Sequence, residues 1–377
     1  MSTKPKILIL SAPVGTGHQV AAAALAQEAL RNGAEVVTKD VFSCLPKVLV
    51  QIILSAYSLL LRWWPEGYAL IYGWGNTQKG SLNLRGWINH FLSWRLHAFI
   101  KNVQPQLVLV THATPAGIMA DYKMNYAPDL YVAGVITDFV VHKWWLYPGI
   151  NTYFVATEKV AESLLNLSAA LPAAPEIVVS GIPVRRHFSR LTYLYARERF
   201  HWQPGTMVCL LIGGGAGILP MEAILEKVTA AYPQHLQLVA VTGTNTDLAA
   251  SLNQFPGVTV YGYTELFPDL LIGADIVVTK AGGLTLAEAL AAGTEIILYK
   301  PLPGQERGNT DYFLEQGLAS LAHNPDEVLR YLQNYQHLPE SARAARLQKR
   351  QQLARPLATQ KIFSWLREHT LYFPDAQ

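Results

Sequence analysis

A pair of glycines before a predicted helix is the strongest sign of chemistry in this sequence. The pair lies in DIVVTKAGGLTLAEALAAGTEIILYKPLPGQERGN, residues 275–309. A predicted strand ends at Thr279. Gly282 and Gly283 follow, and we expect the helix to begin near Thr285. Such a helix N-terminus presents free backbone N–H groups and the positive end of the helix dipole, so this stretch predicts a diphosphate site.

Glu288 lies one turn into this helix and has two interpretations. A carboxylate at this position can accept hydrogen bonds from both hydroxyls of a ribose. Thr285 and Glu288 also have the spacing of a capping box, in which they would only satisfy amides at the helix start. The local pattern leaves both interpretations open.

A second glycine cluster, Gly213–Gly215 with Gly217, follows the apolar run MVCLLI. Alone it would be a generic turn, but two glycine loops after two strands of one half suggest a shared site. The loop PLPGQERGN adds Gln305, Glu306 and Asn309, whose polar groups could orient a sugar.

A further glycine loop opens the chain in SAPVGTGHQVAAAAL, residues 11–25. Gly15, Gly17 and His18 lie where a first strand is expected to turn into a helix. A dinucleotide fingerprint would need a third glycine at position 20, where the chain has Val20. The pattern is therefore only weak evidence for a nucleotide site in this loop. His18 could be a base, a partner of an anionic headgroup, or simply a residue at a helix N-terminus.

These residues follow strands of two α/β halves. Short β-branched runs alternate with helix-length segments, which predicts parallel sheets whose ligands bind at the carboxyl ends of the strands. We predict an N-terminal domain over residues 1–190 and a C-terminal domain over 200–350, joined by a polar helical passage. A helix over 356–377, after a break near Pro356, could pack back on the N-terminal domain.

Composition limits the class of protein. The 377 residues suffice for two domains, half are hydrophobic and only 15% are charged, so disorder is not expected. Cys44 and Cys209 lie far apart in the sequence, which favours a reducing cytoplasm. The best candidate for a membrane span, 48–61, has 14 uncharged residues, whereas a span needs about 20. A segment that only dips into one leaflet stays possible.

Residues 45–101 combine positive charge with tryptophan. Lipid interfaces favour this combination, with rings at headgroup level and cations toward anionic lipid. A helical hairpin packed on its own sheet is the alternative, and a nucleic-acid patch fits the high apolar content less well. Glu66 is the one acidic residue of this segment. Its cations are Lys47, Arg62, Lys79, Arg85, Arg95 and Lys101, and its tryptophans are Trp63, Trp64, Trp74, Trp87 and Trp94.

The stretch TKAGGLTLAEALAAGTEIILYKPLPGQERGN resembles the donor signature of the monogalactosyldiacylglycerol synthases and the processive diacylglycerol glucosyltransferases. More distantly it is similar to the peptidoglycan N-acetylglucosaminyltransferase. The resemblance runs through most of the chain. It implies the GT-B fold, with two Rossmann-like domains whose parallel sheets face a cleft, and inversion at the anomeric carbon of a UDP-sugar.

The resemblance also implies roles for single residues. The glycines of the donor site would contact the diphosphate, Glu288 the ribose, and Gln305 and Glu306 the sugar hydroxyls. No D-x-D motif occurs in the chain, so no metal or other cofactor is expected. The predicted donor residues are Gly214, Gly215, Lys280, Gly282, Gly283, Thr285, Glu288, Gln305 and Glu306.

Transfer of a sugar to an alcohol needs a general base. Asp138 ends the run YVAGVITD and could merely cap a helix, but VITDFVVHKWW resembles the family segment with the proposed catalytic aspartate. We expect Asp138 ahead of His18 as the base, and His112 to be structural. His142 could orient Asp138 or protonate near it. The predicted acceptor-side and lipid-side residues are Gly15, Gly17, His18, His142, Trp63 and Trp64.

The sequence thus predicts a peripheral enzyme at the cytoplasmic face of the membrane that transfers galactose or glucose from a UDP-sugar to the 3-hydroxyl of diacylglycerol. Its expected partners are the UDP-sugar, diacylglycerol and an anionic membrane surface, without nucleic acid. The alternatives are another lipid-linked acceptor, a nucleotide-sugar epimerase, and a non-catalytic nucleotide-sugar binding protein.

Overall fold

The computed structural model describes residues 4–13, 15–63, 67, 79–169, 171–215, 217, 219–231 and 236–370. The chain forms two units. The first comprises Met1–Val184, Leu302–Gly304 and Leu357–Gln377, and the second comprises Arg185–Pro301 and Gln305–Pro356. The polar passage over residues 185–205, which the sequence predicts as the join between the domains, packs with the second unit.

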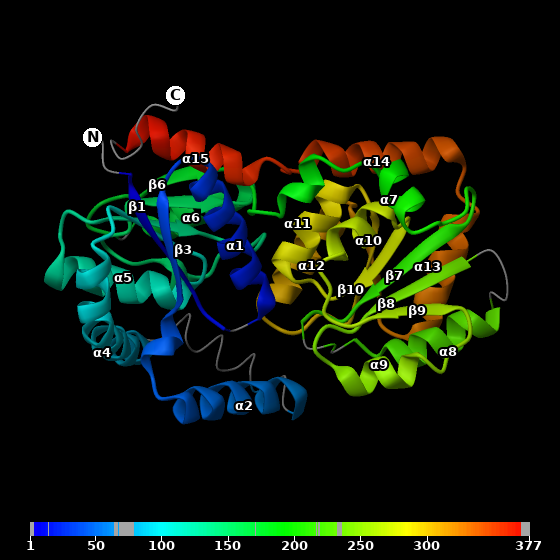
Figure 1. Ribbon diagram of the computed structural model, residues 1–377, viewed down its shortest axis with the longest axis horizontal. Helices are drawn as coiled ribbons and strands as arrows, with labels where there is room; N and C mark the ends of the chain where they lie inside the picture. Colours follow the sequence, from blue (N-terminus) through cyan, green and yellow to red (C-terminus); the bar gives the residue numbers. More distant parts are fainter. Residues whose placement is uncertain are drawn as a thin grey trace. The chain divides into compact units, whose positions relative to one another are not determined.

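The first unit is built around a six-stranded parallel sheet (Figure 1). Its central strands are fully buried apolar runs, which suit a sheet covered on both faces. The strand order is β2-β1-β3-β4-β5-β6. The strands are β1 (Lys6–Ser11), β2 (Glu35–Asp40), β3 (Leu107–Val110), β4 (Tyr131–Val135), β5 (Thr152–Val155) and β6 (Glu176–Val179), with α1 (Thr16–Arg31), α5 (Ala113–Tyr126) and α6 (Glu158–Ser168) between them.

One face of this sheet is covered by α1 and by the last described helix, α15 (Ala358–His369). Ile362, Phe363 and Leu366 of α15 are buried in the same core as Ile7 and Ile9 of β1. Residues at the two ends of the sequence therefore share one hydrophobic core. The helix α15 begins just after Pro356, because proline lacks the backbone N–H that a continuous helix would need.

The second unit has a similar six-stranded parallel sheet, in the order β12-β11-β10-β7-β8-β9. Its edge strand β12, with the sequence ASLA, was not expected from the sequence, because alanine and serine carry little strand preference. The strands are β7 (Met207–Ile212), β8 (Leu236–Val241), β9 (Val258–Tyr261), β10 (Ile276–Thr279), β11 (Glu295–Tyr299) and β12 (Ala319–Ala322).

Helices cover both faces of the second sheet. The helices α8 and α13 pack against one face, and α7, α10, α11 and α14 lie on the other (Figure 1). The helices are α7 (Tyr193–Arg199), α8 (Met221–Ala231), α9 (Thr246–Leu252), α10 (Phe267–Gly273), α11 (Gly283–Ala292), α12 (Gln305–Glu315), α13 (Pro325–Gln336) and α14 (Glu340–Leu353).

Each sheet has one pair of neighbouring strands from which the chain winds in opposite directions. These are β1 and β3 in the first unit and β7 and β10 in the second. Loops that leave the carboxyl ends of such a pair diverge and leave room for a ligand. All four of these loops contain residues that the sequence analysis considers as candidate site residues.

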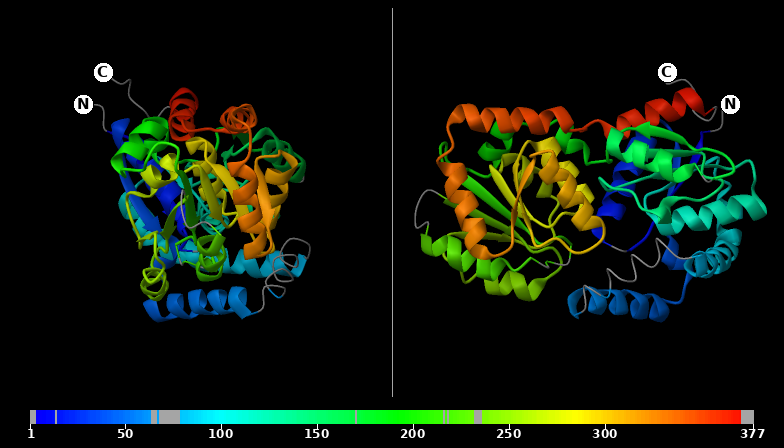
Figure 2. Two further views of the ribbon diagram at one scale, coloured as in Figure 1. Left: turned by 90° about the vertical axis from the view of Figure 1, so that its right-hand side faces the viewer. Right: turned by 180° about the vertical axis from the view of Figure 1, so that it is seen from behind.

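Two further helices, α2 (Lys47–Trp63) and α4 (Lys79–Val103), belong to the first unit. The views in Figure 2 show α2 standing away from the sheet of its unit. Among the helices that the structure describes, none combines the length and the apolar character needed to cross a bilayer.

Candidate functional site

His18 is held at the carboxyl ends of β1 and β3, where the loops after the two strands diverge. It lies in the first turn of α1, and its Nδ1 is 2.9 Å from the carbonyl oxygen of Thr111, just after β3. Nδ1 is also 2.7 Å from Oγ1 of Thr137, which follows β4. Three loops at the carboxyl edge of the first sheet therefore meet at this one imidazole.

These contacts define the tautomer of the neutral ring. A backbone carbonyl can only accept a hydrogen bond, so Nδ1 of His18 carries the hydrogen and donates it to Thr111. The lone pair is then on Nε2, which is the basic atom of the ring. Gly15 is the N-cap of α1 with φ of 81°, a conformation that favours glycine, and Gly17 lies in the first helical turn.

Asp138 lies close enough to His18 to affect its titration. Burial lowers the pKa of His18, the charge of Asp138 raises it, and the net shift is downward from the ordinary value. Asp138 is not a helix N-cap, because the N-cap position of the next helical element, η2 (Lys143–Trp145), is occupied by His142. The interpretation of Asp138 as a helix cap is therefore wrong, and its catalytic role stays a prediction.

Two more histidines flank His18. The rings of His18 and His112 meet edge to face with centroids 4.7 Å apart, and Nδ1 of His112 accepts from the backbone N–H of Thr114 at 3.1 Å. His112 therefore caps α5, which is a structural role. Burial, Arg85 and His18 together lower the pKa of His142 to about 3, so His142 is neutral near pH 7. A neutral imidazole fits an orienting role better than protonation of a neighbour.

The helices α2 and α4 present apolar side chains to solvent. On α4, Trp87 and Trp94 are 68% and 58% exposed, and Phe91 lies between them with ring centroids 6.1 Å from each. Arg85 turns away from this surface, since its Nη2 donates to the backbone oxygen of Trp144. The side chain of Trp63 and the whole of Trp64 lie outside the described residues. Exposed apolar residues on α2 include Val48, Leu49, Ile52, Ile53 and Leu59.

In the second unit, the glycine loop after β7 packs tightly on the loop after β8. Gly214 and Gly217 have φ of 72° and 62°. A Cβ on Gly217 would lie 2.6 Å from the carbonyl oxygen of Thr242, so only glycine fits. Gly215 accepts hydrogen bonds from the N–H and the hydroxyl of Thr244. These contacts fix the loop at the carboxyl end of β7, the strand that pairs with β10.

The helix α11 begins at Gly283, two residues earlier than expected. Its N-cap is Gly282, which offers no side chain to the first amides. The first N–H groups of an α-helix have no intrahelical acceptor, so this end can bind an anion. Thr285 lies inside the helix, so it does not cap the helix, and the capping-box interpretation of Thr285 with Glu288 is wrong.

Glu288 instead pairs with Arg185. Nη1 of Arg185 donates to Oε1 of Glu288 at 2.5 Å, and the Glu288 side chain is almost fully buried. Burial raises the pKa of Glu288 to about 7, although Arg185 opposes the shift. The guanidinium of Arg185 also lies 5.3 Å from the ring centroid of Phe267. Sequence reasoning missed Arg185, for which the arginine pair after GIPV was the available signal.

Other predicted donor residues gather around the end of β10. Lys280 is half-buried, and burial lowers its pKa while the charge of Glu306 raises it. Glu306 and Gln305 form the first turn of α12. Asn309 is buried and donates to the carbonyl oxygen of Ala281 at 2.9 Å, so it holds the loop before α11. Within the described ranges, no three His, Cys, Asp or Glu side chains are grouped as a metal site requires.

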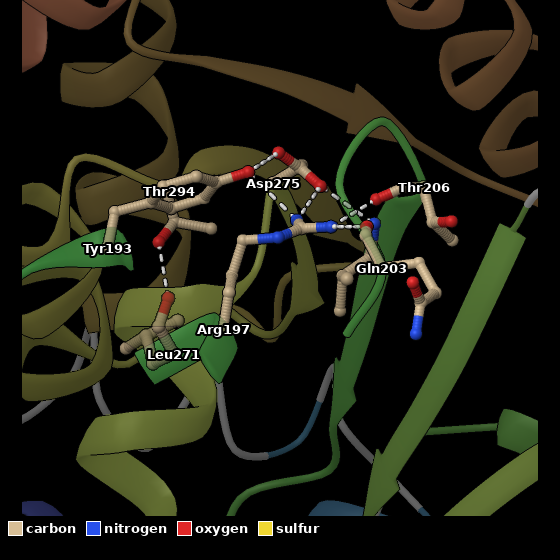
Figure 3. Close-up of polar contacts among 8 residues, drawn as sticks. Tyr193, Arg197, Gln203, Thr206, Leu271, Asp275 and Thr294 are labelled. Atoms are coloured by element: carbon tan, nitrogen blue, oxygen red, sulfur yellow. Dashed lines mark hydrogen bonds and ion pairs between the residues drawn. The ribbon is translucent and has the colours of Figure 1, made fainter. Parts of the chain in front are cut away.

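The second unit holds a further polar network at the opposite edge of its sheet (Figure 3). There Nη1 of Arg197 on α7 donates to Oδ2 of Asp275 at 3.0 Å, and the hydroxyl of Tyr193 donates to Oδ1 of Asp275 at 2.8 Å. Burial and the nearby carboxylate raise the pKa of Tyr193 to about 12. This network ties α7 to the strand β10.

Comparison with solved structures defines the class of fold. The chain is similar to MurG of Acinetobacter baumannii, with a TM-score of 0.61 and 15% identity over 97% of this chain and 99% of that one. It is also similar to a UDP-glucosyltransferase from Polygonum tinctorium, with a TM-score of 0.64 and 14% identity over 97% and 99%. The two parallel sheets and these neighbours define the GT-B fold of glycosyltransferases.

Sequence comparison defines the family. Residues 18–184 match the model of monogalactosyldiacylglycerol (MGDG) synthase, and residues 208–352 match the glycosyltransferase family 28 C-terminal domain. The processive diacylglycerol beta-glucosyltransferase of Bacillus licheniformis is 30% identical over 87% of this chain and 86% of its own. The enzyme of the same name from Bacillus subtilis is 29% identical over 87% and 86%. The chain belongs to this family of glycosyltransferases.

Proposed function

We propose that this protein transfers glucose from UDP-glucose to the 3-hydroxyl of 1,2-diacylglycerol with inversion at the anomeric carbon. The observation that carries the proposal is the similarity to diacylglycerol beta-glucosyltransferases across 87% of the chain, in both units. UDP-glucose has an α linkage, so a β product requires inversion. Galactose is the alternative sugar, because one matching family model describes a galactolipid synthase.

The geometry of the predicted donor site is consistent with binding of a nucleoside diphosphate. The N-terminus of α11 and the glycine loop after β7 follow adjacent strands, so their backbone amides can act on one diphosphate. Lys280 brings a cation to the same edge. Such groups stabilise the charge that develops on departing UDP, and Glu288 is buried where it could accept from ribose hydroxyls.

On the acceptor side we propose that His18 and Asp138 act together. Nδ1 of His18 is engaged with Thr111, which leaves Nε2 to take the proton from the acceptor hydroxyl. The nearby carboxylate of Asp138 favours the imidazolium that results. Asp138 as the base itself remains the competing assignment, as the sequence predicted, and the two differ in their pH dependence.

The exposed face of α2 and α4 supports attachment to a membrane surface. Trp87, Phe91 and Trp94 form one stripe along α4, and Lys47 and Arg95 are exposed cations on the same pair of helices. Aromatic rings and cations together favour the headgroup region of an anionic leaflet. Diacylglycerol is confined to the bilayer, so an enzyme that acts on it benefits from such a face.

A paired-donor assay tests the proposal. Purified protein is incubated with diacylglycerol vesicles and either UDP-[14C]glucose or UDP-[14C]galactose, and the glycolipid is isolated and its anomeric configuration determined. We expect label from UDP-glucose in a β-linked lipid. Label from UDP-galactose alone would replace the sugar assignment, and no transfer from either donor would refute the acceptor class.

A further inference from the structure

A cavity of about 300 Å³ lies at the edge of the second sheet opposite to the glycine loops. Its wall includes Thr206 and Asp275, which directly precede β7 and β10, and Tyr335 and Arg343 from the last two helices of the unit. The predicted donor residues lie at the other ends of the same two strands. This cavity is therefore separate from the donor site.

The first arginine of the cavity, Arg197, already uses both of its terminal nitrogens in hydrogen bonds within the protein. Arg197 donates through Nη1 to Asp275 and to the hydroxyl of Tyr193, and through Nη2 to the carbonyl oxygens of Gln203 and Thr206 (Figure 3). Its charge is neutralised by Asp275 at 3.0 Å. Arg197 is therefore committed to the protein's own groups and is not the main candidate to bind a ligand.

The second arginine, Arg343, is not paired in this way. Its Nη2 donates to the carbonyl oxygen of Gln336 at 2.7 Å, and its guanidinium carbon lies 5.1 Å from the ring centroid of Tyr335. Its Nε is buried and has no hydrogen-bond partner among the residues that the structure describes. No described carboxylate forms an ion pair with it. A buried donor at a charged group that stays unpaired is unfavourable.

The surroundings of Arg343 add to this surplus of positive charge. The charges that act on Tyr335 are the carboxylates Asp275 and Glu295 and the guanidiniums Arg350 and Arg343. Asp275 is paired with Arg197, and Glu295 is paired with both Arg346 and Arg350. Three of these four guanidiniums thus pair with the two carboxylates, and Arg343 forms an ion pair with neither.

We infer that this cavity binds a small oxyanion of the phosphate class, with Arg343 as its main ligand. The volume is at the small end of ligand pockets, and a wall of charged and hydroxyl side chains does not suit an apolar ligand. A guanidinium offers several N–H donors in one plane, which matches the oxygens of a phosphate. The anion would also balance the excess positive charge around Tyr335.

Thermal unfolding of the full chain tests the inference. Sodium phosphate is titrated against sodium chloride of equal ionic strength, with and without saturating UDP, because UDP would fill the donor site. We expect phosphate to raise the midpoint of unfolding saturably, by a few degrees, in both series. No rise beyond that of chloride would overturn the inference, and so would a rise that UDP abolishes, since phosphate would then occupy the donor site.

Variants assign the effect to Arg343. Arg343→Gln should abolish the phosphate-dependent rise, whereas Arg330→Gln, which removes an exposed arginine stacked near Tyr331 on α13, should retain it. Arg343→Lys keeps the charge without the planar fork and should shift the half-saturating phosphate concentration several-fold upward, which also covers the case that the glutamine variant folds poorly. An unchanged rise in both Arg343 variants would refute the assignment.

Discussion

The buried carboxyl of Glu288 makes donor binding dependent on pH. Burial raises its pKa to about 7, and Arg185 remains hydrogen-bonded to one of its oxygens at 2.5 Å. A carboxylate has further lone pairs that can accept from the two ribose hydroxyls, and the protonated form accepts less well. We therefore predict that UDP-glucose binds better as pH rises through 7, because Glu288 is then ionised.

The magnitude follows from this pKa. At about one pH unit below the pKa only about a tenth of the carboxyl is ionised, so affinity at about pH 6 should be roughly tenfold below its plateau above about pH 8. Hydrogen bonds to a charged group contribute about 1.5–3 kcal/mol each. Loss of one such bond in Glu288→Gln should therefore weaken binding by at least about tenfold at pH 8.

Isothermal titration calorimetry with UDP-glucose between pH 6 and pH 8 measures both effects. UDP-glucose suits this test because its diphosphate diester does not titrate in that range. Glu288→Gln should lower the affinity at pH 8 and remove the dependence on pH. Glu226→Gln, at an exposed position on α8, should change neither. Wild-type affinity that is constant across the range, or Glu288→Gln binding as tightly as wild type, would contradict this assignment.

Three further predictions concern the other parts of the molecule. Asp138→Asn should move the acidic limb of the kcat/KM profile to lower pH, because the carboxylate that raises the pKa of His18 is gone; complete loss of the limb would make Asp138 the base. Trp94→Ala should reduce the fraction of protein that floats with anionic vesicles, whereas Tyr263→Ala, at a 71% exposed position in the second unit, should not; equal flotation of the two would remove α4 from the membrane face. Arg197→Met should lower the free energy of unfolding by about 3–5 kcal/mol in urea titrations, since it leaves a carboxylate unpaired; a change below about 1 kcal/mol would show that the network is dispensable.

The glycine loops illustrate how far local pattern reaches. Gly282 and Gly283 mark a helix N-terminus because an anion site there needs bare backbone amides, and the structure has the helix begin at this point. Gly15 and Gly214 adopt positive φ, which is the other reason to expect glycine. Such features depend on a few consecutive residues, so they can be predicted from the sequence.

Other residues could not be assigned locally. The spacing of Thr285 and Glu288 fits a capping box and fits a ligand carboxylate equally well. The capping box is excluded because α11 begins at Gly283 with Gly282 as its N-cap. Glu288 pairs instead with Arg185, which lies about a hundred positions away along the chain. Likewise, His112 and His18 follow similar strands. The side chain of His112 accepts a hydrogen bond from the backbone of its own helix, whereas that of His18 contacts the carbonyl oxygen of Thr111.

The sequence by itself determined the α/β class, the places of both glycine loops and the family, because these follow from short-range pattern and from similarity along the whole chain. The tertiary structure decided which polar side chains share an environment. It joined His18 to Thr111 and Thr137, paired Glu288 with Arg185, and gave Arg343 no ion pair with a carboxylate among the described residues. Burial and Coulomb interactions depend on distance in space, and parallel sheets bring together residues that are far apart in sequence.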